Sequence, residues 1–215
     1  MAIPSFTLAF LVALGASLAV RIWLAQRQIR CVLGRRDEVP SAFAAHVDHA
    51  AHGRAADYTV ARVQVEEVET VVDTMVLLVL TLGGGVAALA RVTDALAWPP
   101  LLRDLALVVA VVVVIGATAL PFAWWRTFRV ETRFGFNRST PRRWLADLAG
   151  VTALAAVLGA PLALATVWLM SAAGATWWLY AWSIWVAFQI ALVMLYPTLI
   201  APLFNHFTPL PPGAL

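Results

Sequence analysis

Three histidines stand three residues apart and could bind a metal ion. His46, His49 and His52 would lie along one side of a helix, with Asp48 beside them. Imidazole nitrogens and carboxylate oxygens are ligands of zinc. Positions i, i+3 and i+6 on a single helix, however, seldom converge on one tetrahedral ion without a ligand from elsewhere. The pattern therefore favours a solvated polar face, and a metal site at these histidines is the alternative.

Three carboxylates form a second polar stripe. Glu66, Glu69 and Asp73 stand at positions i, i+3 and i+7, where a long apolar segment begins. An unpaired charge inside a bilayer is costly, so these side chains would line a water-filled chamber or pair with arginines of the later basic segment. The pattern favours a helix end that faces cytoplasmic water over these roles, and Asp73 is the residue that we most expect to be the exception.

The motifs of known hydrolases are absent from the chain. It contains neither H-E-x-x-H nor G-x-S-x-G, and none of its four histidines is followed by Glu. No apolar segment carries a pair of Asp residues suited to aspartyl chemistry. The residues alone therefore predict a membrane scaffold with no catalytic group and no cofactor of its own.

The composition is that of an integral membrane protein. Hydrophobic residues make up 62% of the chain and charged residues 13%, whereas about 25% of a soluble domain is charged. A membrane-spanning helix needs roughly 20 mostly apolar residues. The sequence predicts an all-α protein with five spans, at about 3–24, 71–90, 105–125, 148–170 and 177–200.

The long segment between the first two spans is predicted to be helical. Apolar residues recur at mostly helical spacing after Gly53. We expect a helix that starts near Arg54 in the cytoplasm and runs unbroken into the second span. That span carries three consecutive glycines, at 83–85, in its interior.

The arginines predict the orientation. All 15 basic residues are Arg, and they concentrate in segments 21–70 and 126–147. Both segments fall on the same side of the five spans, which places them in the cytoplasm, with the N-terminus outside and the C-terminus inside. The bilayer explains these clusters better than nucleic acid does. Arg-only, Ala-rich usage also suggests a GC-rich bacterial genome, and hence a bacterial inner membrane.

Three segments carry a family resemblance: HGRAADYT at 52–59, FRVETRFGFNRST at 128–140, and PTLIAPLFNHFTPL at 197–210. With the five spans, they resemble the N-terminal membrane region of the type I CAAX prenyl endopeptidases, which are integral-membrane zinc metalloproteases. The resemblance covers essentially the whole chain, and E-x-x-F-G-F-N-x-x-T is its most specific element. The matching positions are Ala56, Asp57, Tyr58, Glu131, Phe134, Gly135, Phe136, Asn137, Arg138, Thr140, Pro202, Leu203, Phe204, Asn205 and Phe207.

The resemblance implies tilted helices around an intramembrane chamber that receives a membrane-associated peptide or protein. In the family, the two His of H-E-x-x-H and a later Glu hold zinc, and the motif Glu activates water. None of these residues maps onto the chain. We therefore expect one membrane domain over 1–215, inactive alone as a fragment or truncated product, with zinc only in the missing catalytic region. The alternative is a free-standing, non-enzymatic protein that binds lipid or a hydrophobic peptide, or regulates an intact protease.

The basic segment between the third and fourth spans is predicted to be a packed loop. Phe134 and Phe136 would pack under the helical bundle, and Gly135 would allow the tight backbone between them. Glu131 and Asn137 would anchor the loop by hydrogen bonds to backbone groups or Arg. The alternative is a loose basic loop that serves orientation alone.

Overall fold

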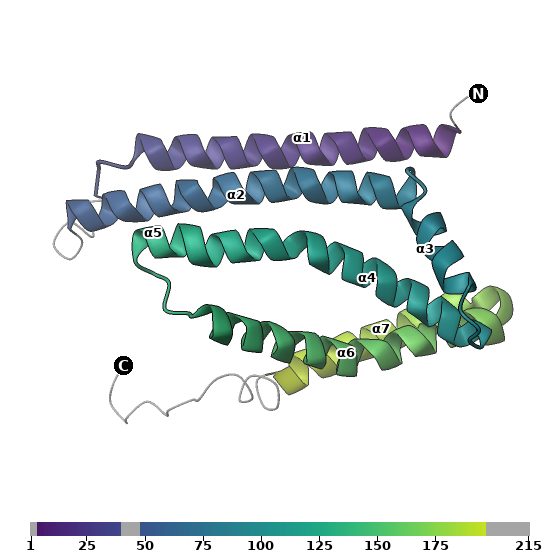
Figure 1. Cartoon of the computed structure of the whole chain (residues 1–215). Coiled ribbons are helices and arrows are strands. Elements are labelled where there is room, and N and C mark those ends of the chain that lie inside the picture. Colours follow the sequence, from purple (N-terminus) through teal and green to yellow (C-terminus); the bar gives the residue numbers. More distant parts are fainter. Residues whose placement is uncertain (1–3, 40–47, 197–215) are drawn as a thin grey trace. The chain divides into compact units, whose positions relative to one another are not determined.

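The computed structural model describes residues 4–39 and 48–196, and every regular element in this part of the chain is helical (Figure 1). Two compact units are present, one formed by residues up to 97 with 106–146, the other by 98–105 with the chain from 147 onward. The elements in chain order are α1 (Ser5–Gly34), α2 (His49–Thr81), α3 (Gly85–Asp94), α4 (Pro100–Trp125), the π-helix η1 (Arg126–Glu131), α5 (Thr132–Phe134), α6 (Pro141–Ala172), the 3₁₀-helix η2 (Gly174–Thr176) and α7 (Trp177–Leu195).

The helices confirm the predicted all-α membrane class. Four stretches are long and apolar enough to cross a bilayer: α1, the continuous helix over residues 100–134, α6, and residues 174–195. The bent pair of α2 and α3 supplies a fifth candidate. Helix α1 extends beyond the predicted end of the first span, and the last residues predicted for the fifth span, 197–200, lie outside the described part.

The second span differs from its prediction, because its three glycines break it. Helix α2 ends at Thr81, α3 begins at Gly85, and the two axes are bent by 55°. Gly84 has φ +76°, and a Cβ added to Gly83 would lie 2.8 Å from the carbonyl oxygen of Val79. Side chains at these positions would be strained or would collide, so the glycines permit the bend.

Helices α1 and α2 pack against each other along the first unit (Figure 1). Ile29 of α1 and Ala56 and Val63 of α2 are buried. Hydrogen bonds also connect these two helices, because the Gln26 amide donates to the two oxygens of the Glu67 carboxylate at 2.7 and 2.9 Å. As predicted, α2 runs unbroken toward the apolar segment, although it begins at His49, a turn earlier than expected.

The basic segment 126–147 is more helical than predicted. Helix α4 continues through the π-helix η1 into α5, and α6 starts at Pro141, so only residues 135–140 are non-helical. Proline suits the first turn of a helix, since its fixed φ is already helical and its missing N–H would have no helical partner there. The predicted long loop is therefore a short turn between two helix ends.

In the second unit, α6 carries the fourth predicted span and α7 the fifth. Pro161 lies inside α6 without ending it. Leu162, Val167 and Leu169 of α6 and Ala181 of α7 are buried. Most other side chains of these helices are exposed, as expected of surfaces that face lipid or further protein.

Candidate functional site

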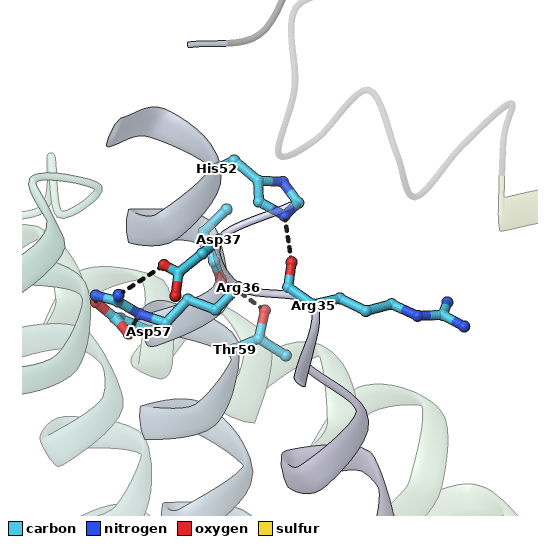
Figure 2. Close-up of polar contacts among 7 residues, drawn as sticks. Arg35, Arg36, Asp37, His52, Asp57 and Thr59 are labelled. Carbon is cyan, nitrogen blue, oxygen red and sulfur yellow. Dashed lines mark hydrogen bonds and ion pairs between the residues drawn. The ribbon is translucent and has the colours of Figure 1, made fainter. Parts of the chain in front are cut away.

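An ion pair joins Arg36, two residues past the end of α1, to Asp57 in the third turn of α2. Arg36 meets the Asp57 carboxylate with two parallel bonds of 2.8 Å, from Nε to Oδ1 and from Nη2 to Oδ2 (Figure 2). Asp37 adds a 3.2 Å contact to the same guanidinium. Both groups lie outside the predicted spans. The hydrogen bond with Arg36 holds the pKa of Asp57 below its ordinary value, and that with Asp57 raises the pKa of Arg36.

His52 ties the same two helices through its ring. Its Nε2–H donates to the backbone carbonyl oxygen of Arg35 at 3.0 Å (Figure 2). His49 is the first residue of α2, and His46 lies outside the described residues, so the histidine trio is not placed as a set. Within residues 4–39 and 48–196, no group of three or more His, Cys, Asp or Glu side chains is arranged to hold a metal ion.

Tyr58 brings the first two family-like segments together. Its ring makes edge contacts with Phe134, at a centroid distance of 5.5 Å, and with Phe136, at 4.9 Å. Gly135 separates the two phenylalanines with φ +78°, which a residue with a side chain adopts only with strain. The expected packing is seen in part, because Phe134 is half-buried whereas 56% of Phe136 remains exposed.

The turn after α5 is closed by backbone and amide hydrogen bonds. The carbonyl oxygen of Glu131 accepts from the N–H groups of Phe136, at 2.8 Å, and Asn137, at 3.2 Å. The Asn137 amide donates to Thr132 Oγ1 at 3.0 Å, and its Oδ1 accepts from the N–H of Ser139 at 2.7 Å. Asn137 therefore anchors the turn through its side chain. Glu131 does so through its main-chain oxygen, and within the described residues no hydrogen bond of its carboxylate is seen.

Two further family-like positions lie near the start of α6. Thr140 directly precedes the helix, and its Oγ1 accepts from the N–H of Arg143 at 3.3 Å, as a cap does. Arg138 lies exposed in the turn.

The base of the turn is closed by aromatic rings. Trp124 packs against Phe128 at a centroid distance of 4.1 Å and against Trp144 at 5.3 Å. Trp144 belongs to the first turn of α6, so these rings join the end of α4 to the start of α6. Both tryptophans also lie where an interfacial aromatic belt is expected.

The predicted carboxylate stripe has three different environments. Glu69 pairs with Arg126 of the π-helix, and both side chains are less than one-third exposed. Glu66 pairs with Arg62 on the same helix at 2.9 Å, which raises the pKa of Arg62. Asp73 is exposed and forms no ion pair within the described residues. Among the three carboxylates, only Glu69 forms the expected ion pair with an arginine of the later basic segment within the described residues.

Sequence reasoning missed Glu67, Arg36 and the π-helix. Glu67 stands beside the predicted stripe and accepts a hydrogen bond from Gln26. A glutamine near the end of an apolar helix was the feature of the sequence from which a polar partner could have been predicted. Arg36 was counted for orientation only. The third family-like segment, with Pro202, Leu203, Phe204, Asn205 and Phe207, lies outside the described residues.

Long apolar helices, joined outside the spans by ion pairs and aromatic contacts, define an integral membrane protein of helical class. The family described as "CAAX prenyl protease N-terminal, five membrane helices" matches residues 28–206. The chain therefore belongs to this family, and the family resemblance of the sequence is confirmed.

Relatives named "CAAX prenyl protease 1 homolog" are similar to part of the chain. The protein of Arabidopsis thaliana is 39% identical over 98 residues, 46% of this chain and 23% of the relative. That of Oryza sativa subsp. japonica is 35% identical over 115 residues, 54% of this chain and 27% of the relative. The human protein is 32% identical over 98 residues, 46% of this chain and 21% of the relative. The matches thus span about a quarter of these relatives, which are eukaryotic and do not support the expected bacterial origin.

A solved structure shows the same fold. The crystal structure of S. mikatae Ste24p aligns with a TM-score of 0.81 and 20% sequence identity, covering 99% of this chain and 50% of that one. The chain therefore corresponds to half of that structure.

Proposed function

We propose that the chain is the membrane-embedded, chamber-forming N-terminal part of a CAAX-type zinc metalloendopeptidase, catalytically incomplete as residues 1–215. The observation that carries the proposal is the family match over residues 28–206. The contact of Tyr58 with Phe134 and Phe136 supports it, because two family-like segments far apart in sequence meet there.

The described residues are suited to a structural role in such an enzyme. Paired carboxylates and arginines hold α1, α2 and the π-helix together: Arg36 with Asp57, and Arg126 with Glu69. Within residues 4–39 and 48–196, no group of side chains fits a catalytic zinc, which needs three convergent ligands and an open position. We assign no catalytic role to any of them, and zinc and its water would belong to a region that carries H-E-x-x-H.

The substrate class follows from the relatives' names. Proteins called CAAX prenyl protease 1 act on prenylated peptides or proteins, so we infer a membrane-associated peptide or protein as the substrate of the complete enzyme. The arginine distribution supports cytoplasmic placement of segments 21–70 and 126–147. A bacterial inner membrane is supported only by the amino-acid usage, in which every basic residue is arginine.

The test isolates from native membranes every polypeptide that contains this sequence and identifies it by mass spectrometry. We expect a product about twice as long, as the Ste24p match indicates, with H-E-x-x-H in its added part and zinc-dependent cleavage of a farnesylated CAAX peptide. Purified residues 1–215 should neither cleave that peptide nor retain stoichiometric zinc. A native product that ends at Leu215 would instead support the free-standing alternative.

A matched variant examines the metal alternative. Zinc should be equally low in residues 1–215 and in the variant with His46, His49 and His52 all changed to Ala. One zinc per chain in the parent, lost in the variant, would overturn the proposed absence of a metal site from this part of the enzyme.

A further inference from the structure

A groove of about 740 Å³ lies within the first unit, between α2 and the continuous helix of α4, η1 and α5. Val65 and Val68 line one wall, and Phe122 and Trp125 line the other. The two residues on each wall are three positions apart, which places them on one face of their helix. A volume of this size is typical of pockets that take a small molecule.

Two arginines stand at one end of this groove. Arg129 Cζ lies 5.7 Å from the ring centroid of Trp125, and Arg133 Cζ lies 5.5 Å from that of Phe134. Both side chains are exposed. Contact with an aromatic face orients a guanidinium while leaving its N–H edge free to donate.

The charges of these arginines are not balanced locally. No ion pair involves Arg129 or Arg133 within residues 4–39 and 48–196, although Arg62 and Arg126 nearby are each paired with a glutamate. Arg133 acts on Asp57 electrostatically, but that carboxylate is already bound by Arg36. The groove therefore joins an apolar wall to two cations whose N–H groups can receive an anion.

The groove lies where the third predicted span ends. Phe122 and Trp125 belong to the last turn of α4, and the two arginines follow within the next helical turns. The tryptophan is typical of the bilayer interface, and arginines on the cytoplasmic side of a span face the phosphates of that leaflet.

We propose that this groove binds an anionic phospholipid, with its phosphate between Arg129 and Arg133 and an acyl chain along Val65, Val68 and Phe122. Charge complementarity selects the occupant, because the groove offers cations at one end and apolar surface at the other. A phospholipid of the surrounding leaflet presents these two chemistries in the same order. The proposal concerns lipid binding by the described residues and does not depend on peptidase activity.

Native mass spectrometry of residues 1–215 in detergent tests the proposal, with dioleoylphosphatidylglycerol and dioleoylphosphatidylcholine added separately. We expect one phosphatidylglycerol to be retained at concentrations where phosphatidylcholine is not. The double variant R129Q/R133Q should weaken phosphatidylglycerol binding by at least about tenfold, the effect of losing charge-assisted hydrogen bonds. The control R142Q/R143Q removes equal charge outside the groove and should bind like the parent.

A second variant addresses the apolar wall. Val68→Trp should occupy the groove and abolish retention of phosphatidylglycerol, with thermal unfolding unchanged. Equal binding of the two lipids, or an equal loss in R142Q/R143Q, would overturn the proposal. It would also be overturned if an apolar peptide with a free C-terminal carboxylate displaced the lipid while its amidated form did not, because the groove would then be a peptide site. Peptidase activity enters none of these measurements, so this proposal and the proposed function fail separately.

Discussion

Asp57 shows how a single family-like position can serve the fold. Its carboxylate accepts both hydrogen bonds from Arg36. Of its neighbours, Ala56 is buried and Tyr58 contacts the rings of Phe134 and Phe136. Partly exposed ion pairs contribute little net stability, since water competes for both charges. The main effect of this pair is therefore to fix where α2 begins relative to the end of α1.

The Asp57 pair makes stability dependent on pH. Because the native pKa of Asp57 is lowered from its ordinary 3.8, its contribution is present above that value and is lost as pH falls through the native pKa. We expect the thermal unfolding temperature of the parent to fall below about pH 4, and that of Asp57→Asn to fall less. The control Glu38→Gln removes a nearby exposed carboxylate, and its unfolding temperature should depend on pH as that of the parent does. Identical pH profiles for parent and Asp57→Asn would contradict the prediction.

Tyr58 is the residue whose loss should separate α2 from the turn after α5. Tyr58→Ala removes two edge contacts, each worth about 0.5–1.5 kcal/mol, so the free energy of unfolding should fall by about 1–3 kcal/mol. Tyr58→Phe keeps both ring contacts and should stay closer to the parent. Phe136→Ala loses one contact of a half-exposed ring and should cost less than Tyr58→Ala. Equilibrium unfolding in mixed detergent measures all three, and the reverse order for Tyr58→Ala and Phe136→Ala would exclude this account.

At the scale of elements, the turn at 135–140 depends on Asn137. Its side chain makes two hydrogen bonds, to Thr132 and Ser139, whereas Glu131 contributes its main-chain oxygen, which any residue would supply. Asn137→Ala should therefore destabilise the protein by about 1–2 kcal/mol. Glu131→Ala should unfold like the solvent-exposed control Arg142→Ala. A larger loss for Glu131→Ala than for Asn137→Ala in the same detergent unfolding experiment would show that its carboxylate is needed.

The break between α2 and α3 depends on glycine. Gly84→Ala must hold an alanine at φ +76°, which costs about 1–2 kcal/mol. Gly159 lies inside α6 with no atom within 4 Å of an added Cβ, so Gly159→Ala should be neutral or stabilising by up to about 1 kcal/mol. Thermal unfolding of the two variants makes the comparison. If Gly84→Ala unfolds at or above the parent's temperature, the left-handed conformation is not required.

For the whole molecule, the distribution of arginines predicts the orientation in the membrane. Cysteines introduced for labelling into residues 135–140 should react only from the cytoplasmic side, and those in Gly174–Thr176 only from outside. The parent's single cysteine, Cys31, is first changed to Ser to give a clean background. Impermeant maleimide applied to spheroplasts and to inverted vesicles measures both positions. Labelling of the arginine-rich segment from outside would reject the five-span topology.

The membrane class, the predicted spans and the family could all be inferred from the amino-acid sequence. Crossing a bilayer requires about 20 apolar residues in succession. The free energy of transferring such a segment into lipid is close to the sum of the contributions of its residues. The information is therefore local in the chain. The family-like segments were equally readable, because E-x-x-F-G-F-N-x-x-T is a continuous string.

The pairing of polar groups and the position of the helix break depend on the folded chain. Asp57 binds Arg36, Glu69 binds Arg126 and Glu67 binds Gln26, yet the same carboxylates could have faced water with an unchanged pattern. Such choices depend on the distance between two helices, which no local periodicity contains. The bend at residues 82–84 likewise depends on how closely the backbone there approaches the preceding helical turn. The three glycines allow a break in the helix, but its position and angle depend on the folded chain.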